Sequence, residues 1–157
     1  MNGRRKMLIN KLSNNNQIIH FWRVGVIVDD DDKEFVIDRD YLYIELDNGY
    51  IKIKSEQGDS KLKVTTCLKR DYKNEDEICC CKLDYLIFNM PEMDYKLCSI
   101  FAKNYFITEN EICSDSLLLE LKVGDFYEKI YICTGISGIL VKNVSLDTKV
   151  GAMEKII

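Results

Sequence analysis

Few residues in this 157-residue sequence could carry out chemistry, and the first of them is its single histidine, His20. A histidine that serves as a general base or a metal ligand needs a nucleophile, an orienting acid or further ligands beside it. His20 lies in the apolar stretch IIHFWR, which supplies none of these groups. We therefore expect His20 to have a structural role.

Three consecutive cysteines, Cys79 to Cys81, are the second candidate. Consecutive residues of a strand point to opposite faces, so these thiols cannot jointly bind one ion. The sequence has no Cys-x-x-Cys pair and no Cys/His set with zinc spacing. We expect the run to pack in the core, and we expect no metal site and no cofactor.

Motifs of nucleotide-binding and hydrolytic enzymes are also missing. No glycine-rich phosphate loop is present, and residues 135–138 (GISG) lack the Gly-x-Ser-x-Gly spacing of a nucleophile elbow. The sequence therefore gives no catalytic residue, and we expect a protein that is not an enzyme.

The most unusual feature is a run of acids. It comprises Asp29, Asp30, Asp31 and Asp32 and continues with Glu34, Asp38 and Asp40. Three interpretations are open: a solvated loop between strands, a calcium site, or an acidic face that binds a basic protein. An EF-hand loop requires spaced acids, a central glycine and a glutamate at its twelfth position, and this run has none of that pattern.

Two tyrosines, Tyr41 and Tyr43, follow the acids and alternate away from the apolar face of the next segment. Tyrosine beside charge suits a protein interface, because its ring is amphipathic. Two tyrosines that cover their own sheet would give the same pattern. We take these tyrosines, together with the seven acids above, as the candidate partner-binding residues.

The elements that must position these residues are strands. In residues 40–54, DYLYIELDNGYIKIK, apolar residues alternate on both sides of Asn48-Gly49, which predicts a hairpin with a type I′ turn. A two-residue turn at Asn48-Gly49 would pair Leu46 with Ile51 and Ile44 with Ile53, and would set Glu45 opposite Lys52. The apolar partners would share one buried face.

A second hairpin is predicted over SLLLELKVGDFYEKIYIC, with a turn at Gly124-Asp125. Its register pairs Val123 with Phe126, Leu119 with Ile130, Leu117 with Ile132 and Glu120 with Lys129. Leu121 opposite Glu128 is the one mismatch.

Further strands are predicted over residues 18–28, 34–37, 61–69, 78–89 and 139–146. Residues 95–106 fit a short helix or a strand, and residues 148–157 form a short tail. The sequence thus predicts a mainly β, single-domain antiparallel sandwich or barrel of about eight to ten strands, with at most one or two short helices. We expect residues 1–16 to be a flexible N-terminal segment and residues 17–157 to be the single β-rich domain.

Composition limits the partners. A net charge of −4 and a pI near 5.1 argue against nucleic acid and suit a basic protein partner. No run approaches the roughly 18 apolar residues of a membrane span. Seven cysteines, an odd number that falls mostly in apolar runs, favour a reducing cytoplasm.

The segment FVIDRDYLYIELDNGYIKIKSEQGDSKLKV, residues 35–64, resembles the hairpin segment of small bacterial immunity proteins encoded beside polymorphic toxins, including contact-dependent growth-inhibition systems. It covers about a fifth of the chain. The resemblance implies a protein that binds its cognate toxin domain, commonly a basic nuclease, and occludes its active site. It carries no functional residues over to this chain.

One alternative is a lipocalin-like barrel that binds an apolar ligand in a cavity lined by Phe21 and Trp22. The phrase HFWRVG shares the tryptophan of the Gly-x-Trp opening of such barrels but lacks its glycine. An enzyme that uses scattered carboxylates ranks third.

Overall fold

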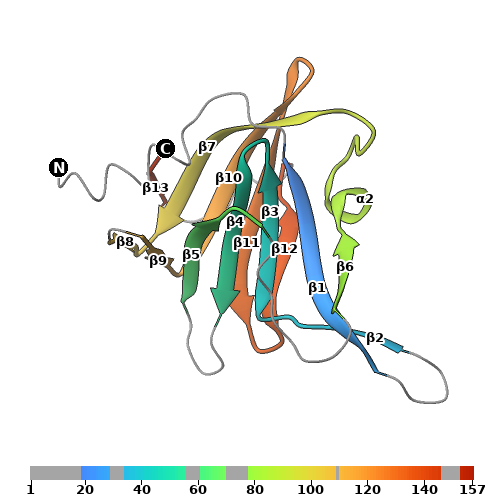
Figure 1. Ribbon diagram of the computed structural model, residues 1–157. Coiled ribbons are helices and arrows are strands. Elements are labelled where there is room, and N and C mark those ends of the chain that lie inside the picture. Colours follow the sequence, from blue (N-terminus) through green and yellow to red (C-terminus); the bar gives the residue numbers. More distant parts are fainter. Residues whose placement is uncertain (1–18, 29–33, 56–60, 70–77, 109, 146–152) are drawn as a thin grey trace.

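Two antiparallel β-sheets packed face to face make up this protein (Figure 1). The computed structural model describes residues 19–28, 34–55, 61–69, 78–108, 110–145 and 153–157, with the backbone alone for 26–28, 34–35 and 78–81. The predicted mainly β fold is confirmed. Of the two predicted architectures, the described residues form the sandwich and no closed barrel.

The larger sheet has eight strands in the order β2-β1-β3-β4-β5-β9-β8, with β6 on the other edge of β1. Its strands are β1 (His20–Val28), β2 (Glu34–Ile37), β3 (Tyr41–Leu46), β4 (Gly49–Ser55), β5 (Leu62–Cys67), β6 (Ile78–Lys82), β8 (Phe106–Ile107) and β9 (Ile112–Ser114). Both β2 and β3 pair with β1, one after the other along the same edge.

The smaller sheet has five strands in the order β12-β11-β10-β7-β13. Its strands are β7 (Tyr95–Lys103), β10 (Ser116–Val123), β11 (Phe126–Gly135), β12 (Gly138–Asn143) and β13 (Glu154–Lys155). A short helix, α2 (Asp84–Ile87), follows β6 at the side of the sandwich (Figure 1).

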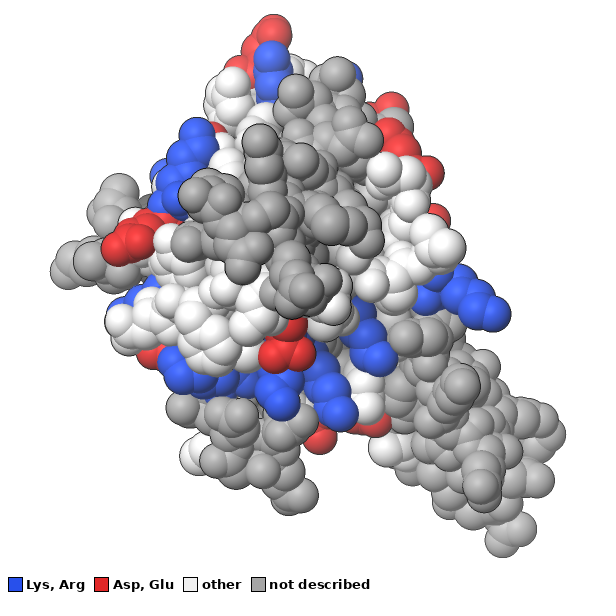
Figure 2. Space-filling view, turned by 60° about the vertical axis from the view of Figure 1, so that its left-hand side comes forward, with Lys and Arg blue, Asp and Glu red and all other residues white. Residues whose placement is uncertain are grey.

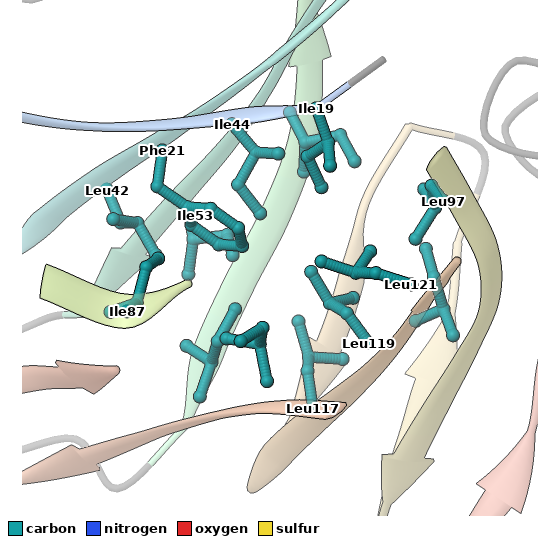
Figure 3. Packing of buried hydrophobic residues seen from close by; sticks show 14 of the residues in the cluster. Ile19, Phe21, Leu42, Ile44, Ile53, Ile87, Leu97, Leu117, Leu119 and Leu121 are labelled. Atoms are coloured by element: carbon teal, nitrogen blue, oxygen red, sulfur yellow. The ribbon is translucent and has the colours of Figure 1, made fainter. Parts of the chain in front are cut away.

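The core lies between the inner faces of the two sheets. Figure 3 shows Phe21, Ile44 and Ile53 of the larger sheet pointing toward Leu117 and Leu119 of the smaller one. All five side chains are at most 2% exposed. Because complete burial of such a side chain contributes roughly 1.5–3 kcal/mol, this layer supplies much of the stability of the fold.

The β10–β11 hairpin has the predicted register, including Glu120 opposite Lys129 and Leu121 opposite Glu128. The β3–β4 hairpin has the predicted buried face but a different register. Leu46 pairs with Gly49, so Glu45 lies opposite Tyr50 instead of Lys52.

The β3–β4 turn differs because its central residues are Asp47 and Asn48. Among the described non-glycine residues only Asn104 has a positive φ, whereas a type I′ turn needs two such residues. Gly49 is placed against β5, where an added Cβ would lie 2.9 Å from the carbonyl oxygen of Cys67. A shift of two residues leaves every side chain on its predicted face.

The expected long strand over 78–89 is wrong, because β6 ends at Lys82 and α2 follows. Asp84 interrupts the ladder: its Oδ1 accepts a hydrogen bond from the backbone N–H of Phe21, at 2.9 Å. The ambiguous segment 95–106 is strand β7, and the predicted tail contains the short strand β13.

A bend at Asp38–Asp40 separates β2 from β3, and the buried Arg23 holds it in place. The Arg23 guanidinium donates to the carbonyl oxygens of Tyr41, at 3.1 Å, and of Ile139 in the other sheet. Burial, together with the nearby positive charge of Arg39, lowers the pKa of Arg23 to about 10. The bend also approaches Gly138, where an added Cβ would lie 2.5 Å from the Arg39 carbonyl oxygen.

Gly138→Ala is therefore expected to destabilise the protein by on the order of 2–4 kcal/mol in urea unfolding. The alanine would combine a strained φ of 101° with a backbone clash. Gly135→Ala is the control, because its Cβ would meet the end of the Leu140 side chain, which can rotate. Equal losses of stability in the two variants would contradict this role of Gly138.

Candidate functional site

The predicted acidic run, Asp29 to Asp32, lies outside the described residues. It connects β1 to β2, whose ends Val28 and Glu34 pair with each other. The side chain of Glu34 also lies outside the described part. In Figure 1 the hairpin of β1 and β2 extends beyond the two packed sheets, at the lower right. We call this hairpin, with residues 29–33 that connect its strands, the arm.

Asp38 and Asp40 lie at the bend where β3 leaves the arm, and both are half-buried. Asp38 accepts a hydrogen bond from the backbone N–H of Asp40, at 3.1 Å, and Asp40 accepts one from the Ser55 hydroxyl, at 3.1 Å. These two acids therefore help to shape the bend as well as adding charge to it.

Tyr41 and Tyr43 lie on the outer face of the larger sheet, as predicted, but their environments differ. Tyr41 is half-buried, with the ammonium groups of Lys52 and Lys54 at 5.5 and 5.7 Å from its ring centre. Tyr43 is 0% exposed and packs edge-on against Tyr50. The expectation that Tyr43 offers surface to a partner is thus wrong; Tyr43 covers its own sheet.

Charge is distributed unevenly along the chain. Residues 29–40, which include the arm's connection and the bend, contain seven acids and two bases, for a net charge of −5. The whole chain carries −4, so the remaining 145 residues together carry +1. Figure 2 shows Lys and Arg side chains gathered in a band across one side of the molecule.

His20 is paired with Asp84, a residue that sequence analysis did not single out. His20 Nδ1 lies 2.6 Å from Asp84 Oδ2, and Lys82 Nζ lies 3.7 Å from the same oxygen. An imidazole oriented by a carboxylate is one part of a catalytic triad. Among the described residues no hydroxyl or thiol is hydrogen-bonded to His20. The His20–Asp84 contact joins β1 to α2.

Metal-binding and thiol sites gain no support. The described residues contain no group of three or more His, Cys, Asp or Glu side chains that could hold a metal ion. Among the described residues, Cys67, Cys98, Cys113 and Cys133 form no disulfide. The side chains of Cys79 to Cys81 lie outside the described part.

The mismatched Glu128 is the centre of a buried polar network. Glu128 is 3% exposed, and its carboxyl group accepts hydrogen bonds from the Asn89 backbone N–H at 3.0 Å, from Asn143 Nδ2 at 2.6 Å and from the Tyr95 hydroxyl. Tyr95 in turn accepts one from the Met90 backbone N–H, at 2.9 Å. The network fixes the loop between α2 and β7.

The cavity expected for a ligand-binding barrel does not form around the predicted residues. Phe21 is buried in the core edge-on against Phe88, whereas Trp22 lies on the opposite face and donates from Nε1 to Glu45, at 2.9 Å. Neighbouring residues of one strand face opposite sides, so the two rings cannot line one cavity.

No helix among the described residues is long and apolar enough to span a membrane. Comparisons with protein-family models, curated proteins and solved structures find no match to this chain.

The buried Tyr95 hydroxyl should make the free energy of unfolding depend on pH in the alkaline range. Burial and the hydrogen bond to Glu128 raise the pKa of Tyr95 to about 12. Between pH 10 and 12 the unfolded chain releases this proton while the folded chain keeps it, so stability falls as the pH rises. The loss from this group is at most about 1.4 kcal/mol per pH unit.

Tyr95→Phe should remove this component of the alkaline slope and cost about 1–3 kcal/mol at pH 7, because Glu128 and the Met90 N–H each lose a partner. Denaturant unfolding at pH 7 to 11 measures both effects. The exposed Tyr127→Phe is the matched control and should change stability at pH 7 by less than about 0.5 kcal/mol. Identical alkaline slopes for wild type and Tyr95→Phe would contradict the assignment.

Proposed function

We propose that this protein is a bacterial immunity protein that binds and neutralises a cognate toxin domain, with a basic nuclease as the class of toxin. The observation that carries the proposal is the concentration of charge in residues 29–40, whose net charge of −5 exceeds that of the whole chain. The surface of a nuclease that binds nucleic acid is basic. The carboxylates of residues 29–40 would bind that surface in place of the phosphates of the nucleic acid.

The position of the acids supports the same conclusion. Asp29 to Asp32 connect strands β1 and β2 of the arm, and these paired strands extend beyond the packed sheets (Figure 1). A β-hairpin that extends beyond the packed sheets can enter a concave substrate groove, whereas the broad faces of the sheets cannot. The partner-binding residues are then Asp29 to Asp32, Glu34, Asp38, Asp40 and Tyr41.

The outer faces of the sheets suit a basic partner poorly. Lys52 and Lys54 surround Tyr41 on the larger sheet, and lysines also project from the outer face of the smaller one. Like charges brought together at an interface cost binding energy, so a basic partner is directed to the arm and the bend. The proposal places the protein in the cytoplasm, where its thiols remain reduced.

The first test is to recover the partner with the tagged full-length chain, from lysate of the source cell, at low and then high salt. We expect one stoichiometric protein with a basic domain, held less firmly in high salt, whose activity on nucleic acid is abolished by adding this protein. A retained partner whose activity persists in the complex, or recovery of a small molecule with no protein, would contradict neutralisation.

The arm can be tested with two variants of equal charge. Asp30→Asn, Asp31→Asn and Asp32→Asn together change the net charge from −4 to −1, as do Glu92→Gln, Asp94→Asn and Asp125→Asn in turns outside the arm and the bend. The arm variant should reduce the association rate with the partner about tenfold or more at low salt, and the control about twofold or less.

Stopped-flow or surface-plasmon-resonance kinetics at two salt concentrations measure both rates. If the two variants slow association equally, net charge and not the arm governs the encounter. If only the control triple slows it, the interface lies away from the arm.

A further inference from the structure

The outer face of the smaller sheet is basic, although the protein as a whole is acidic. Strand pairing places six exposed lysines on this face: Lys96 and Lys103 of β7, Lys122 of β10, Lys129 of β11, Lys142 of β12 and Lys155 of β13. Among the described residues of these strands, Glu120 is the one acid on the same face. Glu128 points into the core.

An apolar row crosses the middle of this face. Lys142 pairs with Tyr131, Tyr131 with Leu118, Leu118 with Phe101 and Phe101 with Lys155, so the row has a lysine at each end. Adjacent strands lie about 4.8 Å apart, which makes the row about 19 Å long. Tyr131 and Phe101 are half-buried and leave part of each side chain accessible.

These lysines differ from those on the outer face of the larger sheet. There, Lys52 and Lys54 lie over Tyr41, Lys82 lies over Trp22, and Lys61 forms an ion pair with Asp115 at 2.8 Å. Within the described part of the chain, none of the six lysines of the smaller sheet makes an ion pair or a ring contact. Lys103 acts at longer range on the Asp115 carboxylate, whereas the ammonium groups of the other five lysines are available to an anion within this described part.

We propose that the outer face of the five-stranded sheet binds single-stranded nucleic acid. The lysines would contact backbone phosphates, and Tyr131 and Phe101 would stack on bases, since sheet faces with lysines around aromatic rings favour unpaired strands over duplexes. Among the described acids of the 29–40 region, Asp38 and Asp40 lie at the bend between β2 and β3 of the other sheet. The inference goes beyond toxin neutralisation and uses a different surface.

An acidic protein segment could meet the same lysines, but the row favours nucleic acid. Each base has a flat ring that can stack on Tyr131 or Phe101, whereas carboxylate side chains gain nothing from the row itself. Polyglutamate therefore serves as the probe that separates the two classes of partner.

The test is fluorescence anisotropy of a labelled 15-nucleotide oligothymidylate with the full-length chain at 50–200 mM salt. Contacts from all six lysines would give a slope of log K against log salt of about −4, at about −0.7 per phosphate for single strands. A duplex of equal length should bind at least about tenfold more weakly, because its bases are not free to stack.

Variants assign the binding to this face. Lys122→Gln, Lys129→Gln and Lys142→Gln together should reduce the magnitude of the slope by about 2 and the affinity at least tenfold. Lys52→Gln, Lys54→Gln and Lys63→Gln make the same charge change on the other sheet and should alter affinity less than about threefold. Tyr131→Phe should preserve affinity, whereas Tyr131→Leu should lower it roughly tenfold.

Thermal unfolding of each variant shows that the affinities compare folded proteins. The proposal would be overturned by no binding of the oligothymidylate at 50 mM salt, by equal losses for the two lysine triples, or by equal affinity for the duplex. Displacement by polyglutamate of equal charge, with Tyr131→Leu as competent as wild type, would overturn it in favour of an acidic protein. The assay contains no toxin, so a negative result would not contradict the proposed binding of a toxin, which is tested by the pull-down.

Discussion

The alternation of side chains along each strand couples the core of this protein to its surface. Two open sheets must each bury one apolar face, and in β10 this places Leu117, Leu119 and Leu121 inside. The alternating side chains between them must then face outward, and these are Leu118, Glu120 and Lys122. The burial of the core thereby fixes which charged and aromatic residues meet solvent or a partner.

Three buried polar groups hold the segments that do not follow this alternation. Arg23 secures the bend between β2 and β3, Asp84 ends β6 and begins α2, and Glu128 fixes the loop before β7. Each of the three makes at least two hydrogen bonds, as buried polar groups require. Loss of one hydrogen-bond partner would leave a buried polar group unsatisfied, which costs free energy of folding. These three residues therefore determine the conformation of the segments that they hold.

Charge is separated by location in a way that net charge conceals. The net charge of −5 in residues 29–40 belongs to the arm and the bend, whereas lysines occupy the outer faces of the sheets. An acidic arm and a basic sheet face suit partners of opposite charge. The same molecule can therefore be expected to use different surfaces for a basic protein and for an anionic strand.

The sequence by itself determined the fold class, most strand positions, the buried faces of both hairpins and the full register of β10–β11. These features depend on local alternation and on a turn glycine, which neighbouring residues specify. Tertiary structure decided the β3–β4 register, the break at Asp84, the burial of Tyr43 and the network around Glu128. Each of these depends on contacts between residues far apart in sequence, such as Gly49 with Cys67, Asp84 with Phe21 and Glu128 with Asn89. A local sequence pattern does not specify such contacts, because they form only when separate strands are brought together.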